Sequence, residues 1–143
     1  MKTKFNFNSQ ICTTREQSEL LLALGLKEET ADMKYPCTRE YYGGVLTEGT
    51  SSLPIIIDTE DDDITEYDTP AWSLGRLIEM MPLDIVPEGG FDNIFMLTKN
   101  YPSGYSVEYD GFSYYHKKNI YDTLIEGIEH LIKEGYFNKE YLV

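Results

Sequence analysis

The sequence predicts a single α+β domain spanning residues 1–143, and three observations support this. Helix signals and strand signals occupy separate stretches, 41% of the residues are hydrophobic, and 13% are aromatic. This composition excludes a disordered chain despite the net charge of −13. The expected order is an N-terminal helical hairpin, a β-hairpin, a central helix, a three-stranded antiparallel meander and a C-terminal amphipathic helix.

The first helix is predicted in TTREQSELLLALGL, residues 13–26. Two capping boxes could start it, Thr13 with Glu16 and Thr14 with Gln17. Gly25 suits the left-handed position after its end, and KEETADM, residues 27–33, predicts a short second helical turn. A DNA-binding helix-turn-helix is not expected, because carboxylates in the second turn would face phosphates.

Two short β-favouring runs follow, Val45 to Thr47 and Pro54 to Asp58. The loop composition EGTSS separates them, so they predict a β-hairpin. TEDDDITEYD, residues 59–68, should form an exposed acidic loop. Its carboxylates suit calcium, but counted from Asp61 the sixth position is Glu66, where an EF-hand loop requires glycine. We therefore expect no metal and no cofactor.

The central helix is predicted to begin with Thr69 as its N-cap and Pro70 at its first position, and to end before Pro82. A period of 3.6 residues places its apolar residues in one stripe that should face the core: Ala71, Leu74, Leu77, Ile78 and Met81.

Trp72, the only tryptophan, falls on the opposite side of this predicted helix together with Arg76 and Glu79. One interpretation is an exposed aromatic and guanidinium patch, a combination enriched at binding hot spots. The other is that a second element, such as the N-terminal helices or the C-terminal tail, covers Trp72. The high average burial of tryptophan favours the second interpretation.

The meander is predicted from three β-rich runs: DNIFMLTK (92–99), YSVEY (105–109) and FSYYHK (112–117). Asp110-Gly111 between the last two runs is a strong signal for a two-residue hairpin turn. Strand alternation places Tyr105, Val107 and Tyr109 on one face.

The last helix is predicted to start at Asn119 as N-cap, with Asp122 in its first turn, and to end at Gly135. Apolar residues recur in it at three- and four-residue steps. The tail YFNKEYLV offers four side chains for packing: Tyr136, Phe137, Tyr141 and Leu142.

Acidic residues are concentrated in the middle of the chain. Residues 55–93 hold eleven carboxylates against the single Arg76, which leaves −10 of the total −13. Such a field repels phosphate and favours a protein partner with a basic surface, so direct nucleic-acid binding is not expected. The candidate interaction residues are Asp61, Asp62, Asp63, Trp72, Arg76 and Glu79.

The sequence indicates a cytoplasmic protein. Cys12 and Cys37 show neither metal-site spacing nor the cysteine density of a secreted scaffold. The N-terminus has no apolar run typical of a signal peptide, and no stretch reaches the ~20 apolar residues that a membrane span needs.

Three segments carry a resemblance to other proteins: ICTTREQSELLLALGLKEETADM (11–33), PAWSLGRLIEMMP (70–82) and NIYDTLIEGIEHLIKEGYFNKEYLV (119–143). They resemble a group of small uncharacterised proteins of gut Bacteroidetes and of their phages and mobile elements. The resemblance implies a bacterial or phage cytosolic setting, and it implies no particular chemistry.

The leading functional hypothesis is a non-enzymatic protein-interaction or regulatory protein, one version being an acidic decoy for a basic nucleic-acid-binding surface. The alternative is a small-ligand-binding protein or enzyme with a tyrosine-lined pocket between the meander and the last helix, formed by some of Tyr105, Tyr109, Tyr114 and Tyr115. A self-associating structural component is a third hypothesis. His116 and His130 lie in no catalytic motif. The partner, the oligomeric state and the sheet order stay open.

Overall fold

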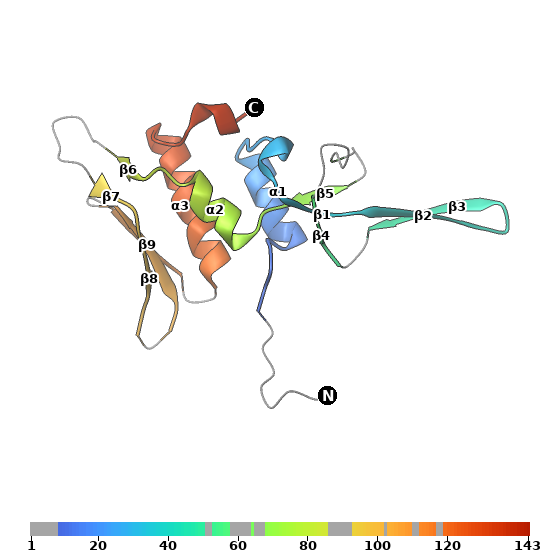
Figure 1. The fold of residues 1–143 in the computed structure, drawn as a ribbon, viewed down its shortest axis with the longest axis horizontal. Helices are drawn as coiled ribbons and strands as arrows, with labels where there is room; N and C mark the ends of the chain where they lie inside the picture. Colours follow the sequence, from blue (N-terminus) through green and yellow to red (C-terminus); the bar gives the residue numbers. More distant parts are fainter. Residues whose placement is uncertain are drawn as a thin grey trace.

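The computed structural model describes residues 9–50, 53–57, 64, 68–85, 93–101, 103–109, 112–116 and 119–143. Within these ranges, the backbone but not the side chains is described for residues 38–42, 45–48, 50, 93 and 112–116. The architecture is α+β, with helices and antiparallel sheets (Figure 1). No helix among these residues is long and apolar enough to cross a membrane.

Helix α3 (Ile120–Glu134) lies at the centre of the molecule, between an antiparallel sheet and helix α1 (Arg15–Ala23) (Figure 1). Its boundaries confirm the prediction. The Asn119 side chain accepts a hydrogen bond from the Asp122 N–H at 2.9 Å, and Gly135 ends the helix at a φ of 78°. The apolar face of α3 is therefore buried on two sides.

The sheet on α3 is the predicted meander. Strands β8 (Met96–Lys99), β9 (Tyr105–Tyr109) and β10 (Phe112–His116) pair antiparallel in the order β10-β9-β8. Val107 and Tyr109, which the alternation places on one face, are buried, and so is Ser106. A Cβ atom at Gly127 of α3 would lie 3.2 Å from Val107 Cγ1, so the helix and β9 approach closely there. The predicted turn Asp110-Gly111 lies outside the described residues.

Helix α1 and the turn after it follow the predicted signals. Of the two capping boxes, the structure uses Thr14 with Gln17. After the helix, Gly25 adopts a φ of 102° and the N–H of Leu26 donates to Leu21 O at 3.2 Å, which is the Schellman arrangement. The second helical turn is a single 3-10 turn, η1 (Glu28–Thr30).

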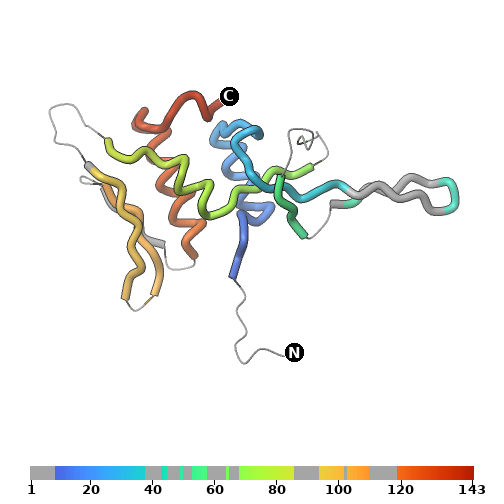
Figure 2. The backbone as a smooth tube through the Cα atoms, viewed as in Figure 1, coloured from blue at the N-terminus to red at the C-terminus, as the bar shows by residue number. Residues whose placement is uncertain are grey.

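The C-terminal tail packs against this turn (Figure 2). It contains the 3-10 turn η2 (Lys139–Tyr141). Lys27 N–H donates to Tyr141 O and Val143 N–H donates to Gly25 O, both at 2.8 Å. Phe137 is buried in the core. The tail thus ties the C-terminal residues to the turn that follows α1.

The predicted β-hairpin was placed wrongly. The structure pairs β2 (Cys37–Tyr42) with β3 (Val45–Thr50), so Val45 to Thr47 do not pair with Pro54 to Asp58. Gly43 and Gly44 both have positive φ, which makes them a two-residue turn of the kind that favours tight hairpins. The β2–β3 hairpin extends away from the helices (Figure 1).

The later run contributes β4 (Ile55–Ile56) to a second sheet, in the order β4-β1-β5. Its centre is β1 (Met33–Tyr35) and its other edge is β5 (Thr69–Ala71). Short strands β6 (Asp84–Ile85) and β7 (Asn93–Ile94) pair separately.

The start of the central helix also corrects the prediction. Helix α2 (Leu74–Met80) begins after Ser73, whose side chain accepts from the Arg76 N–H at 3.2 Å. Thr69 and Pro70 instead belong to β5. Pro70 is tolerated there because β5 is an edge strand.

Candidate functional site

Trp72, the most prominent residue of the sequence, lies in the core. Its exposure is 0%, and it belongs to the main cluster of buried side chains together with Leu21, Leu77 and Leu124. It precedes α2 in the chain, so it does not project from the polar side of that helix. The exposed aromatic patch is therefore excluded for Trp72, and the structure agrees with the interpretation that other elements cover it.

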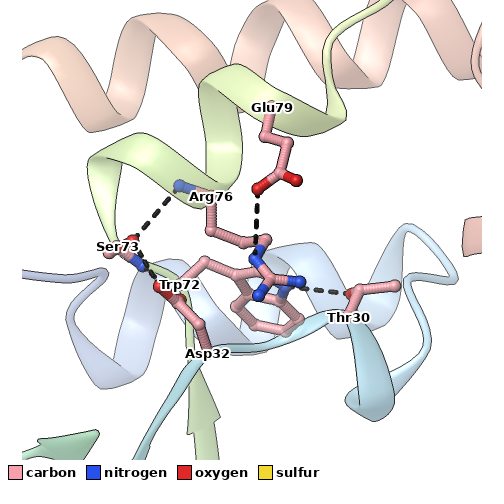
Figure 3. A network of polar contacts seen from close by, with 6 residues as sticks. All are labelled: Thr30, Asp32, Trp72, Ser73, Arg76 and Glu79. Carbon is pink, nitrogen blue, oxygen red and sulfur yellow. Dashed lines mark hydrogen bonds and ion pairs between the residues drawn. The ribbon is translucent and has the colours of Figure 1, made fainter.

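Three hydrogen bonds hold Trp72. Figure 3 shows the one that its indole makes. Its indole N–H donates to Thr30 Oγ1 at 3.0 Å. Its backbone N–H donates to Thr13 Oγ1 at 3.1 Å, and its carbonyl accepts from Thr13 N–H at 2.9 Å. The buried indole thus has the polar partner that buried tryptophans usually find.

Ser73 and Asp32 form a second pair of contacts beside this network. The Asp32 carboxylate accepts from Ser73 N–H at 2.8 Å and from the Ser73 hydroxyl (Figure 3). Because Ser73 also caps α2, Asp32 links the start of β1 to the start of that helix. We call Thr13, Thr30, Asp32, Trp72 and Ser73 the Trp72 junction.

Arg76 and Glu79 pair with each other at the surface. Arg76 Nε lies 3.8 Å from Glu79 Oε2, and the two side chains are 37% and 74% exposed. Solvent screens such a pair, so it contributes little to stability. The one base of residues 55–93 therefore already has a carboxylate partner (Figure 3).

The acidic stretch is described only in part. Asp61, Asp62 and Asp63 lie outside the described residues. The Asp68 side chain is only 8% exposed: its Oδ2 lies 3.4 Å from Lys34 Nζ and its Oδ1 accepts from Cys37 N–H at 3.0 Å. Asp68 therefore has a structural role, and it is not part of an exposed acidic loop.

The space between the meander and α3 is packed where the structure describes it. Val107 and Tyr109 are buried, and the Tyr109 hydroxyl donates to Pro82 O. Burial raises the pKa of Tyr109 above its ordinary value of 10.0. The side chains of Tyr114 and Tyr115 lie outside the description. Of the four tyrosines proposed to line a pocket, only Tyr105 and Tyr109 have described side chains, and these two give the pocket no support.

The buried thiol is also a poor nucleophile. Burial raises the pKa of Cys12, and its Sγ contacts Tyr35 Oη at 3.6 Å. A reactive cysteine needs the opposite environment, one that stabilises the thiolate. Among the described residues, no group of three or more His, Cys, Asp and Glu side chains could hold a metal ion.

A surface groove between α1 and α3 is a candidate site formed by described residues. Its volume is about 350 Å³. Apolar side chains and carboxylates line it: Leu20, Ala23, Leu24, Asp122, Ile125, Glu126 and Glu129. Leu20 is 56% exposed. We call this feature the α1–α3 groove.

The three carboxylates of the groove lie on one face of α3, because they recur at four- and three-residue steps. Asp122 Oδ1 accepts from Gln17 Nε2 at 2.7 Å, which joins the two helices at one end. An adjoining hollow of about 320 Å³ shares Glu126 and Glu129 and adds His130 and Lys133. Lys133 Nζ lies 3.0 Å from Glu129 Oε1. This arrangement can make apolar contacts and attract cations.

Comparison of the chain with protein-family models, with curated proteins and with solved structures finds no match. The function is therefore argued from the residues alone.

Sequence reasoning did not find the α1–α3 groove. The sequence shows the α3 side of the groove, since Asp122, Glu126 and Glu129 share a helical face beside an apolar stripe. The α1 side depends on how α1 packs against α3. That packing brings together residues about a hundred positions apart, which no local pattern reports.

Proposed function

We propose that this chain is a non-enzymatic protein-interaction or regulatory protein that binds a basic surface of another protein. The observation that carries the proposal is the charge: −13 in total, with −10 in residues 55–93. A surface of one sign attracts partners of the other sign and accelerates their encounter. In one version the chain acts as an acidic decoy that occupies a nucleic-acid-binding surface.

The described side chains support an acidic exterior. Glu79 and Asp84 of the acidic stretch are exposed, whereas the Asp68 side chain is only 8% exposed, beside Lys34. Helix α3 presents the three carboxylates of the groove. The resemblance described above supports a bacterial or phage cytosolic setting for such a protein.

A displacement assay tests the decoy version. The probe is a lysine- and arginine-rich DNA-binding domain that carries a fluorescent duplex, and the readout is the anisotropy of the duplex as the chain is added. We expect release of the duplex at about 50 mM salt and much weaker release at about 200 mM, because screening shortens the reach of charges. Binding of the chain to the basic domain that does not depend on salt would contradict the proposal.

A matched pair of variants locates the effect. The triple change Asp61→Asn, Asp62→Asn, Asp63→Asn should weaken release markedly. The control removes the same charge from three exposed glutamates elsewhere, Glu29→Gln, Glu134→Gln and Glu140→Gln. Equal loss in both triples would argue against a special role for the acidic stretch. If the wild-type chain releases no duplex at either salt concentration, the decoy version is wrong.

A further inference from the structure

Residues 138–143 lie across the turn that follows α1, and we call this segment the strap (Figure 2). Two backbone hydrogen bonds hold its far end. Lys27 N–H donates to Tyr141 O, and Val143 N–H donates to Gly25 O, both at 2.8 Å. The strap therefore lies against the residues that connect α1 to η1.

The strap starts at a fixed residue. Phe137, directly before it, is only 4% exposed, and its N–H donates to Leu131 O of α3 at 3.2 Å. Within the strap, Lys139 and Glu140 are exposed, and Leu142 packs against the core. The strap can therefore leave the turn while Phe137 and α3 stay in place, at a lower free energy than unfolding of the core.

A series of hydrogen bonds connects the strap to Trp72. Lys27, whose N–H donates to Tyr141 O, accepts at its own carbonyl from the Thr30 hydroxyl at 2.6 Å. The same hydroxyl oxygen accepts from the Trp72 indole N–H at 3.0 Å (Figure 3). The strap, the η1 turn and the Trp72 junction are thus contiguous, and networks of this kind carry coupling between distant sites.

The Thr30 hydroxyl is the central link of this series. A threonine hydroxyl has one hydrogen to donate, and here it donates to Lys27 O, which leaves a lone pair for the indole. Displacement of Lys27 would remove the acceptor that orients this hydroxyl. The Trp72 side chain is 0% exposed, so an indole N–H without a partner would be costly. The position of the strap and the hydrogen bonding of Trp72 therefore depend on each other.

We propose that the strap is a releasable conformational device that controls the Trp72 junction. In the closed state it fixes Lys27 and, through Thr30, the indole of Trp72. In the open state Lys27 N–H loses its acceptor, and the turn at Glu28–Thr30 and the indole N–H become mobile. A ligand that binds only the open strap would shift the population toward the open state. Binding at this surface would thus change a contact in the core, whether or not the proposed function is correct.

Hydrogen exchange in the full, ¹⁵N-labelled chain tests the proposal. Trp72 is the only tryptophan, so its indole N–H gives a single NMR signal. Its exchange is compared with that of the Lys27 amide, which reports the strap, and that of the Ile128 amide, which reports the centre of α3. In low urea, we expect Lys27 and Trp72 to exchange about tenfold or more faster than Ile128, with the same weak urea dependence. One rate and one urea dependence at all three sites would contradict the proposal.

Two neighbouring substitutions form a matched pair. Leu142 packs against the core, whereas Val143 is 92% exposed, and aspartate at either position adds the same charge. Leu142→Asp should speed exchange at Lys27 and Trp72 by about tenfold or more beyond any change in α3, because burial of a carboxylate disfavours the closed strap. Val143→Asp should change all three rates by less than about twofold. If Leu142→Asp does not fold, Leu142→Ala and the wild-type urea series give the same comparison.

Thr30→Val shows whether the coupling depends on the hydroxyl. In that background Leu142→Asp should still speed exchange of the Lys27 amide, but it should speed the indole by less than about twofold further, because the link to Trp72 is already broken. If Leu142→Asp alone speeds exchange only at Lys27, the strap opens without affecting the junction. If it speeds Lys27, Trp72 and Ile128 equally, the chain has lost stability as a whole. Either result would overturn the proposal.

Discussion

The Trp72 junction and the α1–α3 groove are both contacts that the N-terminal part of the chain makes with a later element, and they differ in one respect. The junction is closed. Trp72 has no exposure, and its indole and backbone groups have hydrogen-bond partners. The groove is open. It leaves Leu20 partly in solvent beside carboxylates.

This difference indicates which contact stabilises the fold and which one is open to a partner. A closed contact with satisfied polar groups contributes to folding and has nothing left to offer a partner. An open apolar contact contributes less to folding and can be completed by another molecule. The sequence left two interpretations of Trp72, a docking residue and a buried one, and favoured the second; the structure shows Trp72 buried.

The largest expected effect is on Trp72. Trp72→Ala should lower the free energy of unfolding by about 3–5 kcal/mol, because it leaves a large cavity and removes the partner of Thr30. Leu20→Ala should change it by about 0.5 kcal/mol or less. Urea denaturation of both variants measures the contrast. If both variants lose a similar small amount of unfolding free energy, the contrast between the closed junction and the open groove is wrong.

Asp32 tests whether the junction depends on its polar network. Asp32→Ala removes the acceptor of two Ser73 hydrogen bonds, and hydrogen bonds to charged groups contribute about 1.5–3 kcal/mol each. We expect Asp32→Ala to lower the free energy of unfolding by about 1.5–3 kcal/mol. Asp84→Ala, at an exposed carboxylate, is the control and should be nearly neutral.

Tyr121 provides a pH-dependent test at the α3 side of the N-terminal segment. Burial raises the pKa of Tyr121 from 10.0 to about 12. Its contribution is fully present below pH 10 and is lost as the pH rises toward 12, because the unfolded chain ionises first. Denaturation at about pH 9 and about pH 11 should therefore show wild-type stability falling more than that of Tyr121→Phe. Parallel falls would show that Tyr121 ionises normally.

The smallest expected effect is on the surface pair. A double-mutant cycle of Arg76→Ala and Glu79→Ala should give a coupling energy of about 0.2–1 kcal/mol, reduced further by salt. A coupling well above that range would mean that the Arg76–Glu79 pair belongs to the junction and is not merely a surface contact.

Local signals predicted the elements whose ends are encoded nearby. The caps at Thr14, Asn119 and Gly135 and the meander all follow from residues within a few positions of each feature. The C-terminal helix was predicted from its N-cap to its terminal glycine for this reason.

Long-range pairing produced the errors. Thr69 and Pro70 are good helix-start residues, yet β1 pairs with them and delays α2 to Ser73. Gly43-Gly44 is a two-residue turn signal that the prediction did not use. The groove was out of reach because it depends on the packing of α1 against α3.

The most direct test uses Trp72, the only tryptophan, as a probe of the junction. Trp72 fluorescence is measured with an added quencher, before and after titration of the basic DNA-binding domain. We expect emission typical of a buried indole, weak quenching, and no change when the domain is added. Strong quenching of the free chain, or protection of Trp72 by the domain, would make Trp72 a docking residue and would contradict its place in a closed junction.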